Sequence, residues 1–397
     1  MKSKYDVVVV GGGPGGLSAA LSASRAGAEV LLLETHRKIG QPVSCAEGIS
    51  CTGLSQVLEP NEDWISSRVS GAKLFSQNGK SMFIDHPNAG YILDRSKFEP
   101  YISKMAEDAG SEIAKGWRAE KPVYEDGRFV RIDVVSNGER KTVEFKILVA
   151  ADGIESTIAR QAGLVKPLLP SRVASCAQYR IEGISIEPET PEFHFNFDIA
   201  PGGYIWVFPK GPDSANVGLG LIPTMAKHLN PFEQLDRFMS SRFDRFKITQ
   251  KMMGVVPLFE GRHTMLKDNL MVVGDAARLI DSLTGAGIAT ALYSGKLAGE
   301  LAAESVQNGN RAAILKEYPK RFMAIFGRRL RMYSLAHQIF RRLKPEELDF
   351  VVGFAEEIFA GKKTYAIDSV DVIRKILTRM PGLINSPPDW SGNRNCR

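Results

Sequence analysis

The apolar positions near the N-terminus fall into two short runs that flank a glycine-rich turn. Residues 5–10 read YDVVVV and residues 29–33 read EVLLL. Runs of this length rich in β-branched residues are typical of parallel strands buried on both faces. Between them, residues 17–26 are mostly small or apolar and end at Gly27, which predicts a helix. The segment therefore predicts a strand–helix–strand unit of the kind that builds a parallel sheet covered by helices.

Later parts of the chain add further elements of both kinds. Residues 147–151 and 269–273 predict two more buried strands, and residues 288–305 predict a long helix rich in small residues. Asn-Gly or Asp-Gly pairs lie between β-rich runs and predict hairpin turns at residues 78–79, 126–127 and 137–138.

The middle of the chain has a different pattern. Short apolar runs separated by Pro and Gly predict an antiparallel sheet, with strands at 177–181, 194–199, 204–209 and 216–221. Residues 232–246 predict one helix within this region. We therefore expect an α/β fold (α+β overall) with a Rossmann-like domain, an antiparallel sheet domain and a helical C-terminal region.

The turn after the first strand carries a nucleotide-binding pattern. Residues 11–16 read GGGPGG and fit G-x-G-x-x-G through Gly11, Gly13 and Gly16, with Pro14 and Gly15 between them. Glycine lets the backbone approach a pyrophosphate, whose charge is stabilised at a helix N-terminus. Glu34 ends the second strand and can accept hydrogen bonds from ribose hydroxyls. The set predicts FAD or NAD rather than NADP, and a glycine turn without a ligand is the alternative.

Two further motifs follow predicted strands. Gly274 and Asp275 follow the strand at 269–273, and a turn with Gly285 and Gly287 precedes the helix that begins at Ile288. Asp152 follows the strand at 147–151, with Ser156 and Arg160 beyond it. A carboxylate at a strand end can hold a polyol, and a helix N-terminus can meet anionic oxygens.

Together these three motifs resemble those of the FAD-dependent oxidoreductases of the p-hydroxybenzoate hydroxylase-like superfamily. The resemblance implies that FAD is bound, with residues 11–16 at the pyrophosphate, Glu34 at the adenosine ribose and Asp275 at the ribityl chain. It also implies a flavin-proximal role for Arg95, which stands in the sequence LDRSKF. For Asp152 and Arg160, a network at a helix start is the alternative.

Residues 201–209 read PGGYIWVFP and place Tyr204, Trp206 and Phe208 on one face of a strand. This segment resembles PxxYxWxFP, a motif of the geranylgeranyl reductases. Residues 42–48 resemble that family's cysteine-bearing loop beside the flavin, with Cys45 and Ala46, although the family more often has Gly where Ala46 stands. The implied reaction is saturation of geranylgeranyl chains, in particular those of digeranylgeranylglycerophospholipids in membrane-lipid biosynthesis.

The resemblance also implies how the chain is divided into domains. We expect an FAD-binding domain in three parts (1–70, 94–166 and 256–310), a hairpin at 71–93 that contributes to the substrate domain, the antiparallel sheet of that domain at 167–255, and a C-terminal helical region at 311–397.

The expected chemistry explains an aromatic wall. An isolated double bond has no carbonyl to accept charge, so its reduction needs a hydride from the flavin and a proton, with cationic character developing on carbon. An aromatic face stabilises a cation by about 0.5–2 kcal/mol. We expect Tyr204 and Trp206 to flank the alkene, Phe208 to extend the wall, and Cys45 to shape the pocket or relay a proton. The alternatives are a purely structural aromatic stripe and an inert buried thiol.

Two other functions share these features. An aromatic-ring monooxygenase would use the same FAD motifs, and a non-catalytic prenyl-binding protein would use the same fold. The aromatic wall favours the reductase over the former, and the intact glycines with Glu34 and Asp275 argue against the latter. The sequence has no second dinucleotide-binding motif, so it does not identify the reductant. Ferredoxin, a deazaflavin and a transiently bound NAD(P)H are the alternatives.

Composition indicates the class of protein and the compartment. Of 397 residues 44% are hydrophobic and 24% are charged, which is typical of a globular protein. The four cysteines match neither a disulfide framework nor a zinc site, so we expect a cytoplasmic protein without a metal. The apolar N-terminal run contains Pro14 and five glycines, so no transmembrane segment is expected.

The net charge of +6 is concentrated near the C-terminus. Residues 316–344 hold nine basic residues and one acid, so the rest of the chain is slightly acidic. Aromatic and aliphatic residues recur there at helical spacing. Either the helix packs on the core with a solvated basic face, or it makes a peripheral contact with an anionic membrane or an acidic electron donor. No recognition motif indicates nucleic acid.

Overall fold

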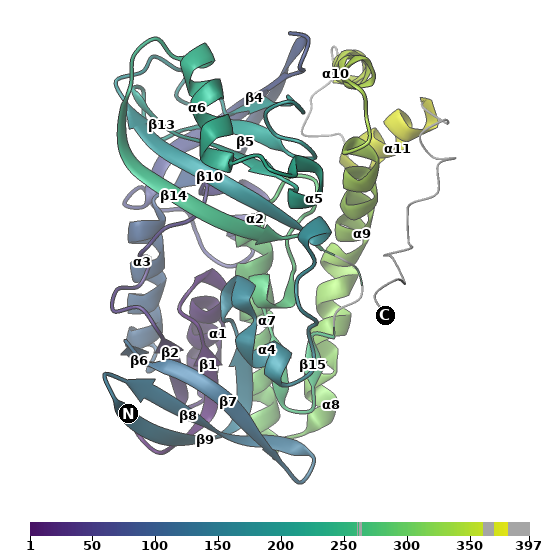
Figure 1. The fold of residues 1–397 in the computed structure, drawn as a ribbon. Helices are drawn as coiled ribbons and strands as arrows, with labels where there is room; N and C mark the ends of the chain where they lie inside the picture. The colour runs from purple at the N-terminus through teal and green to yellow at the C-terminus, as the bar shows by residue number, and fades with distance from the viewer. Residues whose placement is uncertain (260, 262–263, 360–368, 380–397) are drawn as a thin grey trace.

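The computed structural model describes residues 1–259, 261, 264–359 and 369–379. The described chain forms two large sheets, one above the other in Figure 1, with the longest helices running beside and between them.

The lower sheet is built around the predicted nucleotide-binding unit. Its strands follow the order β15 (Leu266–Lys267), β16 (Leu270–Val272), β9 (Glu139–Ala150), β1 (Lys4–Val10), β2 (Val30–Glu34) and β6 (Glu112–Lys115). β1 lies parallel to both β2 and β9, with Val8 opposite Leu31 and Leu148. These apolar side chains are fully buried because helices cover the sheet, among them α1 (Pro14–Arg25) and α7 (Ile288–Gln307).

The predicted hairpin turns are present. β7 (Arg118–Glu125), β8 (Arg128–Ser136) and β9 form an antiparallel ribbon whose turns hold Asp126 and Asn137, both with positive φ. The turn at 78–79 joins β4 (Ile65–Phe75) to β5 (Ser81–Leu93).

The upper sheet has the order β14 (Lys247–Pro257), β10 (Val173–Glu182), β13 (Ser214–Leu221), β12 (Tyr204–Pro209), β11 (Glu192–His194), β4, β5 and β3 (Gly48–Ser50). Its neighbouring strands are antiparallel except for β11 and β4. The expected domain boundary after residue 70 falls inside β4, and β3 also joins this sheet. The N-terminal contribution to the upper sheet thus begins earlier in the chain than residue 71.

The predicted strand at 194–199 is wrong. β11 ends at His194, and the Asn196 side chain then accepts hydrogen bonds from the backbone N–H groups of Asp198 and Ile199. An Asn side chain that bonds two residues onward forms a turn, which here outweighs the alternation of aromatic and polar residues.

Several helices connect and flank the sheets. These are α2 (Cys51–Ser55), α3 (Arg95–Asp108), α4 (Thr157–Gln161), α5 (Pro223–Ala226), α6 (Pro231–Arg242), α8 (Ala312–Leu315), α9 (Glu317–Phe340), α10 (Pro345–Phe359) and α11 (Ser369–Arg379). α6 is the predicted helix at 232–246, ending earlier, and α9 runs along both sheets in Figure 1.

The apolar stripe of α9 belongs to the core. Phe322 and Leu330 are fully buried, and Phe322 stacks on Phe326 with ring centroids 5.1 Å apart. This helix therefore buries its apolar face against the protein, and basic residues such as Lys320 and Arg328 occupy its exposed face. Among the residues that the structure describes, no helix combines the length and apolar composition needed to cross a bilayer.

Candidate active site

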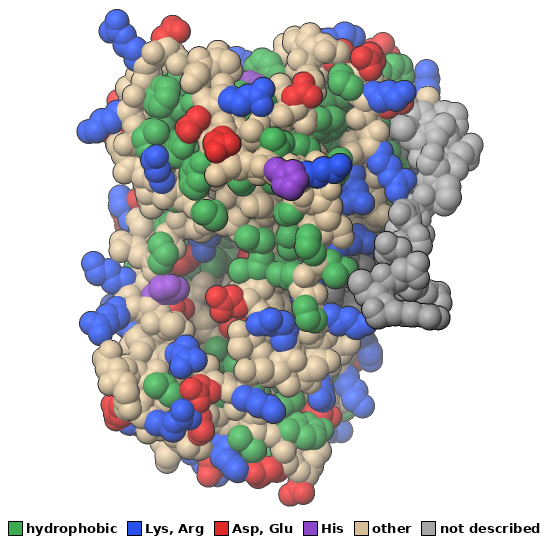
Figure 2. Space-filling view, in the orientation of Figure 1, with side chains coloured by type: hydrophobic (Ala, Val, Ile, Leu, Met, Phe, Trp, Pro, Cys, Tyr) green, Lys and Arg blue, Asp and Glu red, His purple; other side chains and the backbone are tan. Residues whose placement is uncertain are grey.

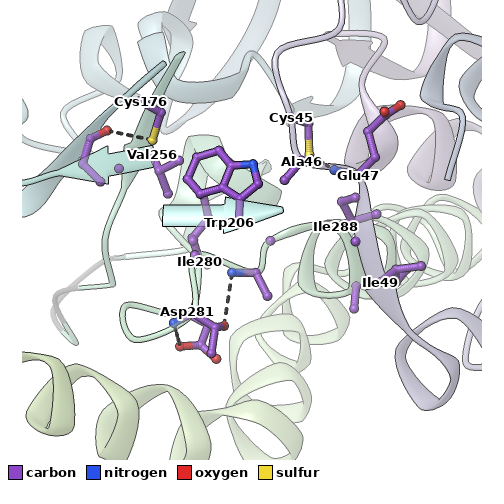
Figure 3. Close-up of a pocket in the computed structure, with 18 of the residues that line it drawn as sticks. Cys45, Ala46, Glu47, Ile49, Cys176, Trp206, Val256, Ile280, Asp281 and Ile288 are labelled. Atoms are coloured by element: carbon purple, nitrogen blue, oxygen red, sulfur yellow. Dashed lines mark hydrogen bonds between the residues drawn. The ribbon is translucent and has the colours of Figure 1, made fainter. Parts of the chain in front are cut away.

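A cavity of about 930 Å³ lies between the two sheets. Most of the predicted site residues line it: Gly13, Pro14, Gly15, Cys45, Ala46, Arg95, Tyr204, Trp206, Phe208, Gly274, Asp275, Gly285, Gly287 and Ile288. Gly11, Gly16, Glu34 and Asp152 do not line it. Figure 3 shows one part of the cavity, where Trp206 lies between Cys176 and Cys45, Ile280 and Asp281 lie below it, and Ile288, the first residue of α7, lies to its right.

The glycines of the first turn have two different roles. A Cβ on Gly11 would lie 2.1 Å from the Ala151 carbonyl oxygen, and one on Gly16 would lie 1.9 Å from the Gly11 carbonyl oxygen. These two positions therefore need glycine so that β1, β9 and α1 can pack closely. A Cβ on Gly13 would meet nothing within 4 Å, so the backbone there is open to a ligand.

Glu34 stabilises this turn from the end of β2. Its Oε2 accepts a hydrogen bond from the Gly12 backbone N–H at 2.6 Å, and its Oε1 accepts one from the His36 N–H at 2.7 Å. The ring Nδ1 of His36 also lies 2.7 Å from Oε1, so of about four acceptor positions on the carboxylate one remains for a ribose hydroxyl.

Asp275 and the start of α7 form the opposite side of the cradle. Burial raises the pKa of Asp275, Arg95 lowers it, and no hydrogen bond within the described part of the chain satisfies its carboxylate. Gly285 has φ +70°, and Gly287 caps α7, so the N–H groups of the first turn of this helix adjoin the cavity. These groups favour an anionic or hydroxyl-rich ligand.

Asp152 lies behind the cavity wall. Its Oδ2 accepts a hydrogen bond from the Ile158 N–H at 2.8 Å, while its buried Oδ1 has no partner. Burial raises the pKa of this carboxyl group. This geometry fits the helix-start network that the sequence left open.

The loop with Cys45 is fixed by side chains of the upper sheet. Gln178 Nε2 donates to the Cys45 carbonyl at 2.9 Å, and Asn216 Nδ2 donates to the Ala46 carbonyl at 3.3 Å. The Cys45 Sγ accepts a hydrogen bond from the Glu47 N–H at 3.2 Å. Burial opposes the charge of Arg95, but Glu99 and Cys45 raise the pKa of Arg95, so this guanidinium stays cationic next to the thiol.

Sequence reasoning missed Glu47, which is fully buried next to Cys45. Its carboxylate accepts hydrogen bonds from the Arg95 N–H, Arg180, Lys210 and Asn216, at 2.7–2.8 Å. Burial lowers the pKa of Lys210, and Glu47 acts against that change. The Glu47 carboxylate thus joins its loop to β10 through Arg180 and to β13 through Asn216, with Arg180 and Lys210 as its two cationic partners. The backbone of Glu47 has a positive φ of 72°.

The aromatic wall is larger than the sequence predicted. Tyr204, Trp206 and Phe208 all face the cavity, as their period-two spacing predicts. Phe193 on β11 contacts both Tyr204 and Phe208, with ring centroids 5.7 and 5.4 Å away. Phe195 continues the contacts to Phe340 at the end of α9, at 5.3 Å. Of the missed rings, Phe193 lies just before the predicted strand at 194–199, Phe195 lies within it, and Phe340 lies in a helix more than a hundred residues away.

Glycines on the neighbouring strand make room for this wall. Trp206 lies opposite Gly218 in the β12–β13 register, and Tyr204 lies opposite Gly220. A Cβ on Gly218 would lie 2.5 Å from Cζ2 of Trp206. The indole therefore packs directly on the backbone of β13.

Proton-bearing groups surround Trp206. The Tyr204 hydroxyl donates to the Thr284 carbonyl, and burial raises the pKa of Tyr204. Cys176 donates to the Ala174 carbonyl, and burial raises the pKa of this thiol to about 12. Cys45, Cys51 and Cys176 are free thiols, and Cys396 lies outside the described residues. Within the described ranges, no group of three or more His, Cys, Asp or Glu side chains could hold a metal.

Comparison with known proteins identifies the family. Residues 172–256 match the geranylgeranyl reductase catalytic domain, and residues 6–164 match the FAD dependent oxidoreductase family. A digeranylgeranylglycerophospholipid reductase of Methanococcoides burtonii is 36% identical over 88% of this chain and 87% of its own length. The chain belongs to the geranylgeranyl reductase family. It is therefore an FAD-dependent oxidoreductase.

Two more relatives extend the match. The digeranylgeranylglycerophospholipid reductase of Methanocella arvoryzae is 34% identical over 97% of this chain and 98% of its own length. The crystal structure of a geranylgeranyl bacteriochlorophyll reductase-like protein from Thermoplasma acidophilum has a TM-score of 0.89, with 31% identity, and the match covers 96% of this chain and 99% of that chain.

The residues present fit FAD, the family's cofactor. The open backbone at Gly13 can receive a pyrophosphate, the unsatisfied Asp275 carboxylate can accept from a polyol, and Glu34 can accept from a ribose. The Cys45 loop and the aromatic wall line the same cavity as this cradle.

Proposed function

We propose that this geranylgeranyl reductase saturates isolated double bonds in the geranylgeranyl chains of a digeranylgeranylglycerophospholipid. The observation that carries the proposal is a chain of ring contacts from Trp206 through Tyr204 and Phe195 to Phe340. Trp206, Tyr204 and Phe340 line the cavity. These rings share that cavity with the FAD cradle, so an apolar chain can lie against the cofactor site. The names of the relatives support a diether phospholipid as the substrate.

In the proposed reaction, each double bond gains one hydride and one proton. Bound FAD in its reduced form supplies the hydride. Trp206 and Tyr204 present ring faces that exclude water and stabilise cationic character on the alkene carbon. The Cys45 thiol lies in the cavity wall, where Arg95 interacts with it electrostatically and where it shapes the pocket or relays the proton.

The reductant and the location belong to the same proposal. Ferredoxin, a deazaflavin or NAD(P)H restores reduced FAD after each turnover. We place the enzyme in the cytoplasm, in peripheral contact with the anionic inner face of the membrane. Exposed basic residues on α9, such as Lys320, Arg321 and Arg328, support this contact.

The test uses the purified holoenzyme, a digeranylgeranylglycerophospholipid in neutral detergent, and dithionite. We expect mass increases of about 2 Da for each double bond reduced, and no change without protein. A Tyr204→Phe variant and a Cys45→Ala variant, each assayed by single-turnover oxidation of the prebound reduced flavin, test the two residues separately. Wild-type rates in both would remove these side chains from the mechanism.

The same preparation separates the alternative functions. A monooxygenase would consume NADPH and O₂ with phenolic substrates and would leave the lipid mass unchanged. A prenyl-binding protein would bind the lipid without FAD. Either result would contradict the proposed reductase activity.

A further inference from the structure

Two arginines from distant parts of the chain lie together at the end of α9. Arg172 ends the short helical turn Pro170–Arg172 before β10, and Arg341 follows the last residue of α9. The Arg341 guanidinium donates at 3.4 Å to the carbonyl of Ser171, the residue before Arg172, and the two arginines interact electrostatically. Because the Arg172 carbonyl accepts from the Leu258 N–H at 3.0 Å, the pair also lies beside the end of β14.

This pair lies against the rim of the cavity. Leu258, His337 and Phe340 all line the cavity, and His337 stands one helical turn before Arg341. Val255 and Met253 on β14 line it too, although they are 44% and 65% exposed. The cavity therefore reaches solvent along this part of β14, close to Arg172. Figure 2 shows hydrophobic side chains across the waist between the two sheets, with Lys and Arg gathered to their right.

The charge of the pair is not balanced by protein carboxylates. Burial lowers the pKa of Arg341, and the neighbouring cations Arg172 and Arg342 lower it further. No salt bridge within the described ranges includes Arg172 or Arg341. Like charges held together in a half-buried position repel each other, so an anion that joins both would stabilise the arrangement.

We infer that Arg172 and Arg341 bind the phosphate of the glycerophospholipid while its chains occupy the cavity. This inference rests on the proposed function, since it names how that substrate is recognised. A guanidinium group offers a planar pair of donors that matches two phosphate oxygens. Phosphate at the rim and prenyl chains along Phe340, Tyr204 and Trp206 would place the polar and apolar parts of one lipid on matching surfaces.

The test compares two lipids that differ only in the headgroup. Digeranylgeranylglycerophospholipid and the neutral digeranylgeranylglycerol are presented in the same non-ionic detergent with dithionite. The variants are Arg172→Gln, Arg341→Gln and the double variant, with Arg131→Gln on the distant β7–β8 hairpin as the matched control. For the phospholipid we expect KM to rise about tenfold for each arginine removed, with kcat nearly unchanged. KM for the neutral lipid should stay the same, as should the amount of bound FAD.

Other outcomes would overturn the inference. An equal change for both lipids, or no change for either, would mean that the pair does not bind the phosphate. Loss of FAD in the variants would assign the pair to the cofactor, and loss only of binding to anionic vesicles would assign it to the membrane. If millimolar inorganic phosphate competes as well as the whole lipid, the pair is a free-phosphate site. If the wild type reduces neither lipid, the proposed function itself fails, which is a distinct result.

Discussion

The indole N–H of Trp206 donates to Oε1 of Gln178 at 2.9 Å, so the central ring of the aromatic wall is oriented by an amide on β10. The same amide donates through Nε2 to the Cys45 carbonyl at 2.9 Å. One buried side chain thus orients both the central ring of the aromatic wall and the loop that carries the Cys45 thiol.

Replacing Gln178 should uncouple these two features. In Gln178→Leu the indole N–H and the Cys45 carbonyl lose their partner, which should cost about 1–3 kcal/mol of unfolding free energy. We expect the turnover rate to fall more than tenfold while FAD remains bound, because the cradle does not involve Gln178. Single-turnover kinetics and denaturant titration measure the two effects, and an unchanged rate would refute this positioning role.

Glu47 should be among the most sensitive carboxylates of the chain. Glu47→Gln leaves Arg180 and Lys210 without their buried anion, which should destabilise the fold by about 3–5 kcal/mol. Glu187→Gln is the control, because Glu187 pairs with Lys73 at the surface and its loss should change stability by less than about 1 kcal/mol. Equal losses in the two variants, measured by denaturant unfolding, would contradict the structural argument.

Two glycines on β13 allow a graded test of the aromatic wall. In Gly218→Ala the new methyl group would lie 2.5 Å from the Trp206 ring, so we expect about 1–3 kcal/mol of destabilisation and a displaced indole. In Gly220→Ala the nearest atom, Cys176 Sγ, is 3.3 Å away, so the effect should be smaller. KM for the prenyl lipid and indole fluorescence report the displacement, and the reverse order of effects would count against this packing.

Gly13 separates cofactor binding from folding. Its φ is −79°, which any residue can adopt, and a Cβ there meets no protein atom. Gly13→Ala should therefore leave the stability of the apoprotein within about 0.5 kcal/mol while it weakens FAD binding. Thermal unfolding of the apoprotein and flavin absorbance after dialysis check the two parts. Full FAD retention would place the pyrophosphate elsewhere.

Stability should fall in acid partly through Glu192. Burial alone would raise the pKa of this carboxyl group, but His194 and Arg242 lower it to about 2, below the ordinary 4.5. The stability from this lowering is present above about pH 4.5 and is lost as the pH falls towards 2. In Glu192→Gln the unfolding free energy should depend less on pH in that window, and an unchanged slope would exclude this contribution.

The parts of the site that could be predicted are those encoded by neighbouring residues. Gly11 to Gly16 and the alternating Tyr204, Trp206 and Phe208 depend on local spacing, which the sequence displays directly. Glu47 could not be found in this way, because its partners Arg180, Lys210 and Asn216 stand 133, 163 and 169 residues away. The turn at Asn196 was missed for a different reason, since a side-chain hydrogen bond there overrides the apolar alternation.

The strand order of the lower sheet has a consequence for synthesis on the ribosome. β9 ends at Ala150, and its residues 144–150 pair with β1. On the other side β8 covers residues 139–144, but β16, which pairs with residues 148–150, begins only at Leu270. Strands β10 to β14 of the upper sheet are translated in between. Until residue 270 has emerged, the nascent chain therefore carries an apolar strand with one open edge, which can pair with other chains. A chaperone would have to cover this edge of β9 during the interval, or β15 and β16 would have to dock on it as soon as they emerge.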